Sequence, residues 1–270
     1  MKLTFHISDV RPFINWIYFF HTWGMSGNHG VERKQLRADA NAMLDSWEGR
    51  FHTYAIFKLF DANSDGDDLL LDDVRIPMLR QQKVSNSGYP NLCLSDFVRP
   101  LSSGIKDKVG AFATTVNADI ENLYPDDVYR HMLAMILAER LAEATVERLH
   151  ADVRKYYWGY APDEKLSISD MLKERYQGIR PAVGYPSMPD MSVNFILSTL
   201  IDMPQTGIHL TDSGMMVPHA SVSGLMFSHP QATYFNIGKI GEDQLTDYAR
   251  RRGVPVEQMR RFLISSMIKK

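Results

Sequence analysis

Apolar residues recur at helical spacing in two long stretches of the chain. They lie three or four positions apart between Leu36 and Trp47, which predicts a helix over Val31 to Trp47. A longer helix is predicted from Asp126 to about Lys155. Acidic side chains at its start and basic side chains at its end complement the helix dipole. Because apolar residues cover most of its circumference, we expect it to be buried.

Shorter apolar runs predict strands and further helices. Strands are expected at Tyr54–Phe60, Leu69–Leu71, Gly110–Val116, Val222–Phe227 and Tyr234–Ile240. The turn-forming residues from Asn63 to Gly66 indicate that the first two strands form a hairpin. Helices are expected at about Ser167–Glu174, from Glu242 to Gly253, and from Pro255 onward. Since strands and helices are interspersed without regular βαβ units, a single α+β domain over residues 1–270 is favoured.

Composition and charge narrow the class of protein. The chain has 270 residues, 44% of them hydrophobic, which is enough to bury a sizeable core. Thirty basic residues against 32 acidic ones provide no basic excess for nucleic acid. Cys93 is the only cysteine, so no intramolecular disulfide can form. The apolar stretch from Phe13 to Trp23 is too short to span a bilayer. We expect a soluble cytoplasmic protein.

One motif resembles a calcium-binding loop. The pattern D-x-N-x-D-G begins at Asp61, and its twelfth position is Asp72. That position usually carries Glu, and the eighth position, Asp68, is usually apolar. The flanking sequences YAIFKLF and LLL indicate strands rather than the two helices of such a motif. We therefore expect a hairpin turn that does not bind calcium.

Other common catalytic patterns are missing from the sequence. The nine histidines form no H-E-x-x-H pair, and no C-x-x-C, G-x-S-x-G or G-x-G-x-x-G motif occurs. We expect neither a catalytic side chain nor a protein-bound metal. The missing glycine loop also disfavours a methyltransferase of the Rossmann type.

A stiff segment, GIRPAVGYP at residues 178–186, is the best candidate for a binding site. Its two glycines and two prolines expose backbone groups, and Arg180 could hold a carboxylate through two parallel hydrogen bonds. Tyr185 adds an aromatic face for a planar ring or a cation. These residues alone leave a structural arginine as the more common role.

A series of motifs along the chain resembles the activation domain of cobalamin-dependent methionine synthase. Arg180 to Pro186 matches the family's R-x-x-x-G-Y-P signature. The other similar segments, in order, are RPFINWIYFFHTW (11–23), MLRQQ (78–82), NLCLSDFV (91–98), VGAFA (109–113), RLAEA (140–144), VRKYYWGYAPDEKLS (153–167), ASVSG (220–224), FSHP (227–230) and DYARRRG (247–253). The resemblance implies a single C-shaped α+β domain, in which a twisted antiparallel sheet is flanked by helices.

The resemblance also implies a site for S-adenosylmethionine. The residues that match the family's binding positions are Arg180, for the methionine carboxylate, and Gly184, Tyr185, Pro186, Tyr234, Phe235, Asn15, Glu174 and Glu143. Asn15 replaces an Asp that faces the ligand's ammonium group, and Phe235 replaces the usual Tyr. His219 and Val183 also depart from the family pattern. Glu143 belongs to a stripe with Glu139 and Glu147 whose spacing is typical of a solvated helix face.

The implied function is reactivation of an oxidised corrinoid. S-adenosylmethionine would supply the methyl group and a flavodoxin-like donor one electron, while the cobalamin would be carried by a separate methionine synthase or related corrinoid protein. We expect the chain not to be a complete methyltransferase, because 270 residues leave no room for the family's other modules. The alternative is a degenerate module that docks on a corrinoid protein without using S-adenosylmethionine. Arg180 and Tyr234 favour the first function, whereas Asn15 and Phe235 favour the second.

Overall fold

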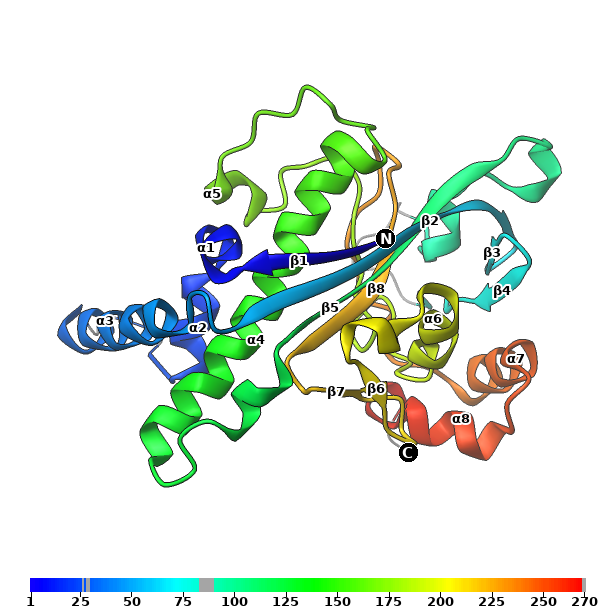
Figure 1. Ribbon diagram of the computed structural model, residues 1–270. Coiled ribbons are helices and arrows are strands. Elements are labelled where there is room, and N and C mark those ends of the chain that lie inside the picture. Colours follow the sequence, from blue (N-terminus) through cyan, green and yellow to red (C-terminus); the bar gives the residue numbers. More distant parts are fainter. Residues whose placement is uncertain (26, 28–29, 83–89, 269–270) are drawn as a thin grey trace.

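An antiparallel sheet forms the centre of the molecule (Figure 1). The structure is a computed structural model that describes residues 1–25, 27, 30–82 and 90–268. The strands are β1 (Lys2–His6), β2 (His52–Asp65), β3 (Asp68–Leu71), β4 (Val74–Pro77), β5 (Asp107–Val116) and β8 (Ser221–Met226). Their order is β4-β3-β2-β5-β8, and β1 also pairs with β2. Strands β6 (His209–Leu210) and β7 (Met216–Val217) form a separate pair.

Strand β2 organises the sheet because it is paired along both sides. Strand β5 runs antiparallel to nearly its whole length, from the pair Thr53–Val116 to the pair Ala62–Asp107. On the other side, β1 pairs with the first half of β2 and β3 with the second half. The predicted hairpin is confirmed. However, β2 continues through the expected turn to Asp65, and the turn itself is Gly66 and Asp67.

The helices lie on both faces of the sheet. They are α1 (Ile7–Val10), α2 (Trp16–Thr22), α3 (Gly30–Trp47), α4 (Val128–Asp152), α5 (Ile168–Met171), α6 (Val193–Ile201), α7 (Glu242–Arg252) and α8 (Val256–Phe262). Helix α4 packs against β2, β5 and β8, and α6 packs on the same three strands (Figure 1). Alternate residues of the strands supply two apolar clusters, so that Phe112 belongs to the α4 cluster and its neighbours Ala111 and Ala113 to the α6 cluster. In the described residues, none of these helices has the length and apolar character needed to cross a bilayer.

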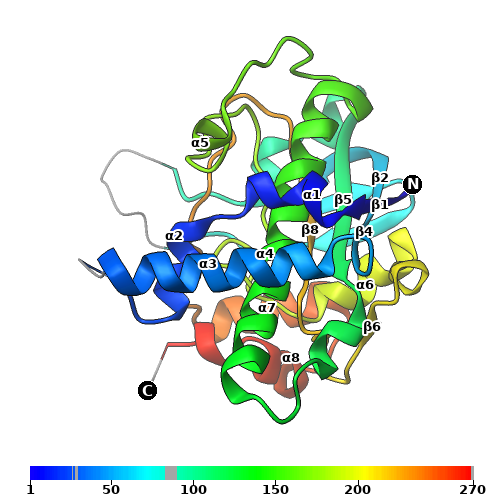
Figure 2. The ribbon, with the colours of Figure 1, turned by 60° about the vertical axis from the view of Figure 1, so that its left-hand side comes forward.

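The predicted helices agree with the structure at their main boundaries. Helix α4 begins after Asp127, whose Oδ1 accepts a hydrogen bond from the Arg130 amide at 3.0 Å. Its last residue is followed by one π-helical turn, Val153–Tyr157. Helix α3 lies across α4 in Figure 2. Helix α7 ends at Arg252 and is capped by Gly253, which has a left-handed φ of 66°.

The prediction of a strand at Tyr234–Ile240 is wrong. This segment is irregular, and its backbone groups form hydrogen bonds to separate parts of the chain instead of to one neighbouring strand. The amide of Ile237 donates to the Pro186 carbonyl oxygen at 2.9 Å, and Asn236 accepts from the Gln81 side chain at 3.0 Å. The helix predicted at Ser167–Glu174 is also shorter, because Glu174 has a positive φ of 57°.

Candidate functional site

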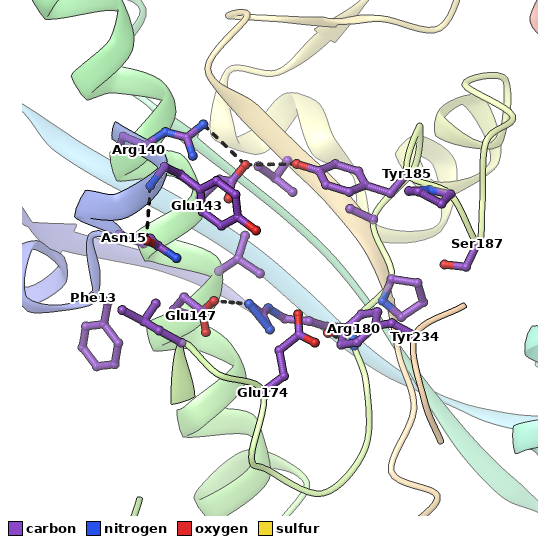
Figure 3. A pocket seen from close by; sticks show the side chains of 18 of the residues that line it. Phe13, Asn15, Arg140, Glu143, Glu147, Glu174, Arg180, Tyr185, Ser187 and Tyr234 are labelled. Atoms are coloured by element: carbon purple, nitrogen blue, oxygen red, sulfur yellow. Dashed lines mark hydrogen bonds and ion pairs between the residues drawn. The ribbon is translucent and has the colours of Figure 1, made fainter. Parts of the chain in front are cut away.

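A cavity of about 760 Å³ opens between helices α2 and α4, the segment after α5 (residues 172–187) and a segment before α7 (residues 234–236) (Figure 3). This volume is in the range of small-molecule sites. Its walls combine polar side chains with Phe13, Phe112, Tyr234 and Phe235. Since the four walls come from distant parts of the sequence, the fold assembles the cavity.

The segment from Gly178 to Gly184 forms one wall because it is bound to strand β8. The amide of Ile179 donates to the Phe227 carbonyl oxygen at 3.0 Å, and the Phe227 amide donates back to Ile179 at 2.9 Å. Two more hydrogen bonds join Leu225 to Pro181 and Val183 to Ser223. Gly178 has φ +82°, and a Cβ there would lie 2.2 Å from the Phe227 carbonyl oxygen. This close approach holds the Arg180 backbone against the sheet.

Arg180 is the central cation of the cavity. Its Nη2 donates to Glu147 and its Nη1 to the hydroxyl of Tyr176, while its backbone N–H donates to the Tyr234 hydroxyl at 3.0 Å. Burial opposes the charge, but the Glu147 carboxylate and the neighbouring tyrosines outweigh it, so the pKa of Arg180 is well above its ordinary value. The guanidinium is therefore a fixed cation in the cavity wall.

Acidic groups outnumber basic groups in the lining. The carboxylates are those of Glu143, Glu147 and Glu174, and the guanidiniums are those of Arg140 and Arg180. With histidine neutral, the lining has a formal charge of −1. Such a site favours a ligand that combines a carboxylate with more than one positive group.

Glu143 is held in place by a tyrosine. The hydroxyl of Tyr185 donates to Glu143 Oε1 at 3.0 Å (Figure 3). Burial, with Glu143 as a further cause, raises the pKa of Tyr185 to about 12, so the hydroxyl keeps its proton. Glu174 is exposed at the cavity, and no hydrogen bond or ion pair joins its side chain to any other residue that the structure describes. The Glu143 carboxylate thus already accepts a hydrogen bond, whereas the Glu174 carboxylate has no partner among the described residues.

Asn15 has a structural role in addition to its place in the lining. Its Oδ1 accepts hydrogen bonds from the amides of Ile17 and Tyr18, at 3.1 and 3.4 Å, and so caps the N-terminus of α2. The oxygen is therefore engaged, and the side-chain NH₂ is the group that remains for a ligand. An Asp would cap the helix equally well.

A second buried cluster lies behind Arg180. Arg154 forms a bidentate ion pair with Glu164, at 2.7 Å for both contacts, and these side chains are 1% and 9% exposed. The ring of Tyr176 lies 4.3 Å from the Arg154 guanidinium and 5.5 Å from that of Arg180. His150 packs edge-on against the same ring, at 4.8 Å. Burial and the two guanidiniums lower the pKa of His150, so its imidazole is neutral.

The structure brings together most of the residues predicted from the sequence. Eight of them line the cavity: Asn15, Glu143, Glu174, Arg180, Tyr185, Pro186, Tyr234 and Phe235. Gly184 is outside the lining, but its φ of +87° shapes the adjacent turn. A solvated face, the alternative interpretation of the stripe on α4, does not hold for Glu147, whose side chain is only 14% exposed. No local pattern indicated this, because its partner Arg180 lies 33 residues away in sequence.

The hairpin that resembles a calcium loop uses its carboxylates differently. Asp61 accepts from Lys106 and Lys108, both at 3.1 Å, and Asp68 accepts from Arg75 at 2.8 Å. Arg251 binds the other oxygen of Asp68. No group of three or more potential metal ligands occurs in the described part of the chain. Asp61 and Asp68 are therefore ion-pair partners.

Comparison with known proteins gives two concordant matches. The model of a family described as the activation domain of vitamin B12 dependent methionine synthase matches residues 6–253. A crystal structure of the MetH reactivation domain bound to AdoHcy (S-adenosylhomocysteine) is similar, with a TM-score of 0.92 and 39% sequence identity. The match covers 100% of this chain and 90% of that chain. The predicted fold, a curled antiparallel sheet flanked by helices, is confirmed.

Proposed function

Because the chain belongs to the family of activation domains of vitamin B12-dependent methionine synthase, we propose that its cavity binds S-adenosylmethionine for the reductive methylation of a corrinoid. The observation that carries this proposal is the fixed cation of Arg180 in a cavity with aromatic walls and an excess of carboxylates. The solved relative contains S-adenosylhomocysteine, the product left when S-adenosylmethionine donates its methyl group.

Each chemical group of the ligand has a counterpart in the lining. Arg180 would hold the methionine carboxylate through charge-assisted hydrogen bonds. The ammonium and sulfonium groups carry two positive charges, and Glu143 and Glu174 supply carboxylates near them. Tyr185, Tyr234 and Phe235 offer aromatic faces for the adenine ring or the sulfonium. The net charge of +1 on S-adenosylmethionine complements the −1 of the lining.

The proposed task of the protein is positioning. A cobalamin-binding methionine synthase or related corrinoid protein would supply the cobalt centre that accepts the methyl group, with one electron from a flavodoxin-like donor. This chain's residues would bind the methyl donor and fix its orientation toward the corrinoid, which lowers the entropic part of the barrier. This task requires binding groups rather than a nucleophile or a general base, and the lining is rich in such groups.

Docking on a corrinoid protein without use of S-adenosylmethionine is the second candidate function. Its support is the double departure at the site, where Asn15 lacks the carboxylate charge and has its oxygen engaged by α2, and where Phe235 lacks a hydroxyl. The two functions differ in their requirement for the ligand.

Calorimetric titration with S-adenosylmethionine, followed by a methylation assay, tests the proposal. We expect saturable binding, and then a change of the corrinoid spectrum from Co(II) to methyl-Co(III) when a cobalamin-binding partner and a reductant are added. Ligand binding without any methylated corrinoid from the candidate partners would favour docking alone. Absence of ligand binding by the folded protein would refute the proposed site.

A further inference from the structure

Glu147 and Arg180 meet where the ligand's carboxylate is proposed to bind. Oε1 of Glu147 accepts a hydrogen bond from Nη2 of Arg180, and the side chains are 14% and 12% exposed (Figure 3). A ligand carboxylate on Arg180 would bring a second anion to a guanidinium that already holds one. When two carboxylates share a poorly solvated site, their repulsion favours protonation of one of them.

We propose that Glu147 takes up a proton when the ligand's carboxylate binds Arg180, so that ligand binding is linked to proton uptake. This inference rests on the proposed function, since it requires a carboxylate ligand in this cavity. The proton comes from solvent and is bound by the Glu147 carboxyl group. Arg180 then faces one ionised carboxylate, that of the ligand.

The environment of Glu147 already opposes its negative charge. The charged side chains that act on it are Glu143 on α4, Arg154 on the π-helical turn after α4, and Arg180. His150 on α4 and Tyr176 lie beside these groups, and the same cavity is lined by His21 on α2, Glu174 and Tyr234. Burial raises the pKa of Glu147, Arg180 and Arg154 oppose this shift, and Glu143 adds to it. An additional anion on Arg180 would weaken the main opposing influence and raise the pKa further.

Two buried atoms without hydrogen-bond partners, one on Glu147 and one on His150, favour a protonated Glu147 carboxyl group. Glu147 Oε2 and His150 Nδ1 are both buried without a hydrogen-bond partner in the described residues. The two residues are three positions apart, and so are neighbours on one face of α4. In the tautomer whose Nε2–H donates to the Tyr160 hydroxyl, 3.3 Å away, Nδ1 of the neutral ring is an acceptor. Protonation of Glu147 would supply a donor one turn from this acceptor, whereas the ionised form adds a second acceptor.

Calorimetry in buffers of different ionisation enthalpy measures this proton directly. With S-adenosylhomocysteine as the probe and the full chain as the protein, the binding enthalpy should depend on the buffer, in the direction of proton uptake. The affinity should fall as the pH rises between the pKa of Glu147 in the free protein and its higher pKa in the complex. The dissociation constant should change by at most about tenfold per pH unit, and the titrations cover about pH 5 to pH 8.

Glu147→Gln is the matched variant, because its amide oxygen can still accept from Arg180 but cannot take up the proton. We expect its binding enthalpy to be independent of the buffer, its affinity to be flat with pH, and its binding near pH 8 to be several-fold tighter than that of the parent. His150→Gln should keep the buffer dependence. The ligand's own ionisation is common to all three proteins and cancels in the comparison.

The possible outcomes are separable. Binding by the parent without proton uptake would overturn this inference and leave the proposed function intact, whereas no binding would refute both. Proton uptake that persists in Glu147→Gln and disappears in His150→Gln would assign the proton to His150 and overturn the inference. Should Glu147→Gln fail to fold, absence of proton uptake by the parent, or its loss in His150→Gln, would still overturn the inference.

Discussion

The hairpin of β2 and β3 and the cavity face of α4 both bring carboxylates together with arginines, but in different surroundings. At the hairpin, Asp68 is 8% exposed and both of its oxygens are paired, one with Arg75 of β4 and the other with Arg251. In the cavity, Glu147 and Arg180 are nearly buried, and one oxygen of Glu147 is unpaired among the described residues. The hairpin has the more conspicuous sequence motif, yet the unpaired carboxylate oxygen belongs to Glu147 at the cavity. Because Asp68 is at least as buried as Glu147, unfilled hydrogen-bonding capacity, more than burial or the density of charges, distinguishes a site from a set of ion pairs.

The largest expected effect is a loss of stability when the buried Arg154–Glu164 ion pair is broken. Arg154→Ala would leave Glu164 buried without its bidentate partner, which we expect to lower the free energy of unfolding by about 3–5 kcal/mol. Arg75→Ala is the control, because Asp68 keeps Arg251, and its expected cost is at most about 1 kcal/mol. Urea denaturation measures both. Equal losses for the two variants would remove the distinction between the two regions.

The next effect concerns ligand affinity. Loss of the charge-assisted contacts of Arg180 should cost roughly 1.5–3 kcal/mol of S-adenosylmethionine binding, or about tenfold to 150-fold in the dissociation constant. Because Arg180→Ala alone leaves Glu147 unpaired, the double variant with Glu147→Gln protects the fold, and its affinity is compared with that of Glu147→Gln alone. Arg75→Ala should bind like the parent. Equal affinities of the folded double variant and Glu147→Gln would contradict the assignment of Arg180.

A smaller effect is expected at Asn15. Asn15→Asp adds a charge for the ligand's ammonium group and should tighten S-adenosylmethionine binding by about 1 kcal/mol, or roughly fivefold. Because Asp also caps helices, the melting temperature should not fall, whereas Asn15→Ala should lose about 1 kcal/mol of stability. Weaker binding by Asn15→Asp together with a lower melting temperature would show that Asn15 is only structural.

The smallest effect is expected for calcium at the hairpin. Asp61, Asp65 and Asp68 are already paired with lysines and arginines, so micromolar calcium should leave the melting temperature unchanged. Thermal unfolding with calcium and with a chelator measures this. A calcium-dependent rise in the melting temperature would mean that calcium displaces the lysines and arginines, and that the hairpin is a calcium-binding site.

Local patterns predicted the elements whose signals are strong and regular. Helices α3 and α4 were predicted because their apolar residues follow the helical period over many turns. Helix α6 was not, because its nine-residue sequence VNFILSTLI is a short apolar run, and such a run fits a buried strand as well as a helix. The run from Tyr234 to Ile240 has the composition of a strand, but its hydrogen bonds go to Pro186 and Gln81, which sequence spacing does not reveal.

Residues of the cavity lining were predicted from the sequence, whereas the ion pair between Glu147 and Arg180 was not. The resemblance to a family supplied Arg180 and seven other residues of the lining, because they lie in segments that match the family. It did not supply Glu147, whose spacing from Glu143 on α4 resembles that of a solvated face. Its partner Arg180 is 33 residues away in sequence. A long-range ion pair of this kind depends on the packing of α4 against the segment after α5, which no local pattern encodes.

The four backbone hydrogen bonds that join β8 and the adjacent Phe227 to the segment from Ile179 to Val183 have a consequence for solubility. Strand β8 is the last strand of the sheet, and an uncovered edge strand is a template on which other chains can aggregate. The segment that presents Arg180 covers part of this edge, so it cannot swing away as a free lid without exposing the edge. Selection for a well-placed arginine and selection against aggregation therefore act on the same few residues.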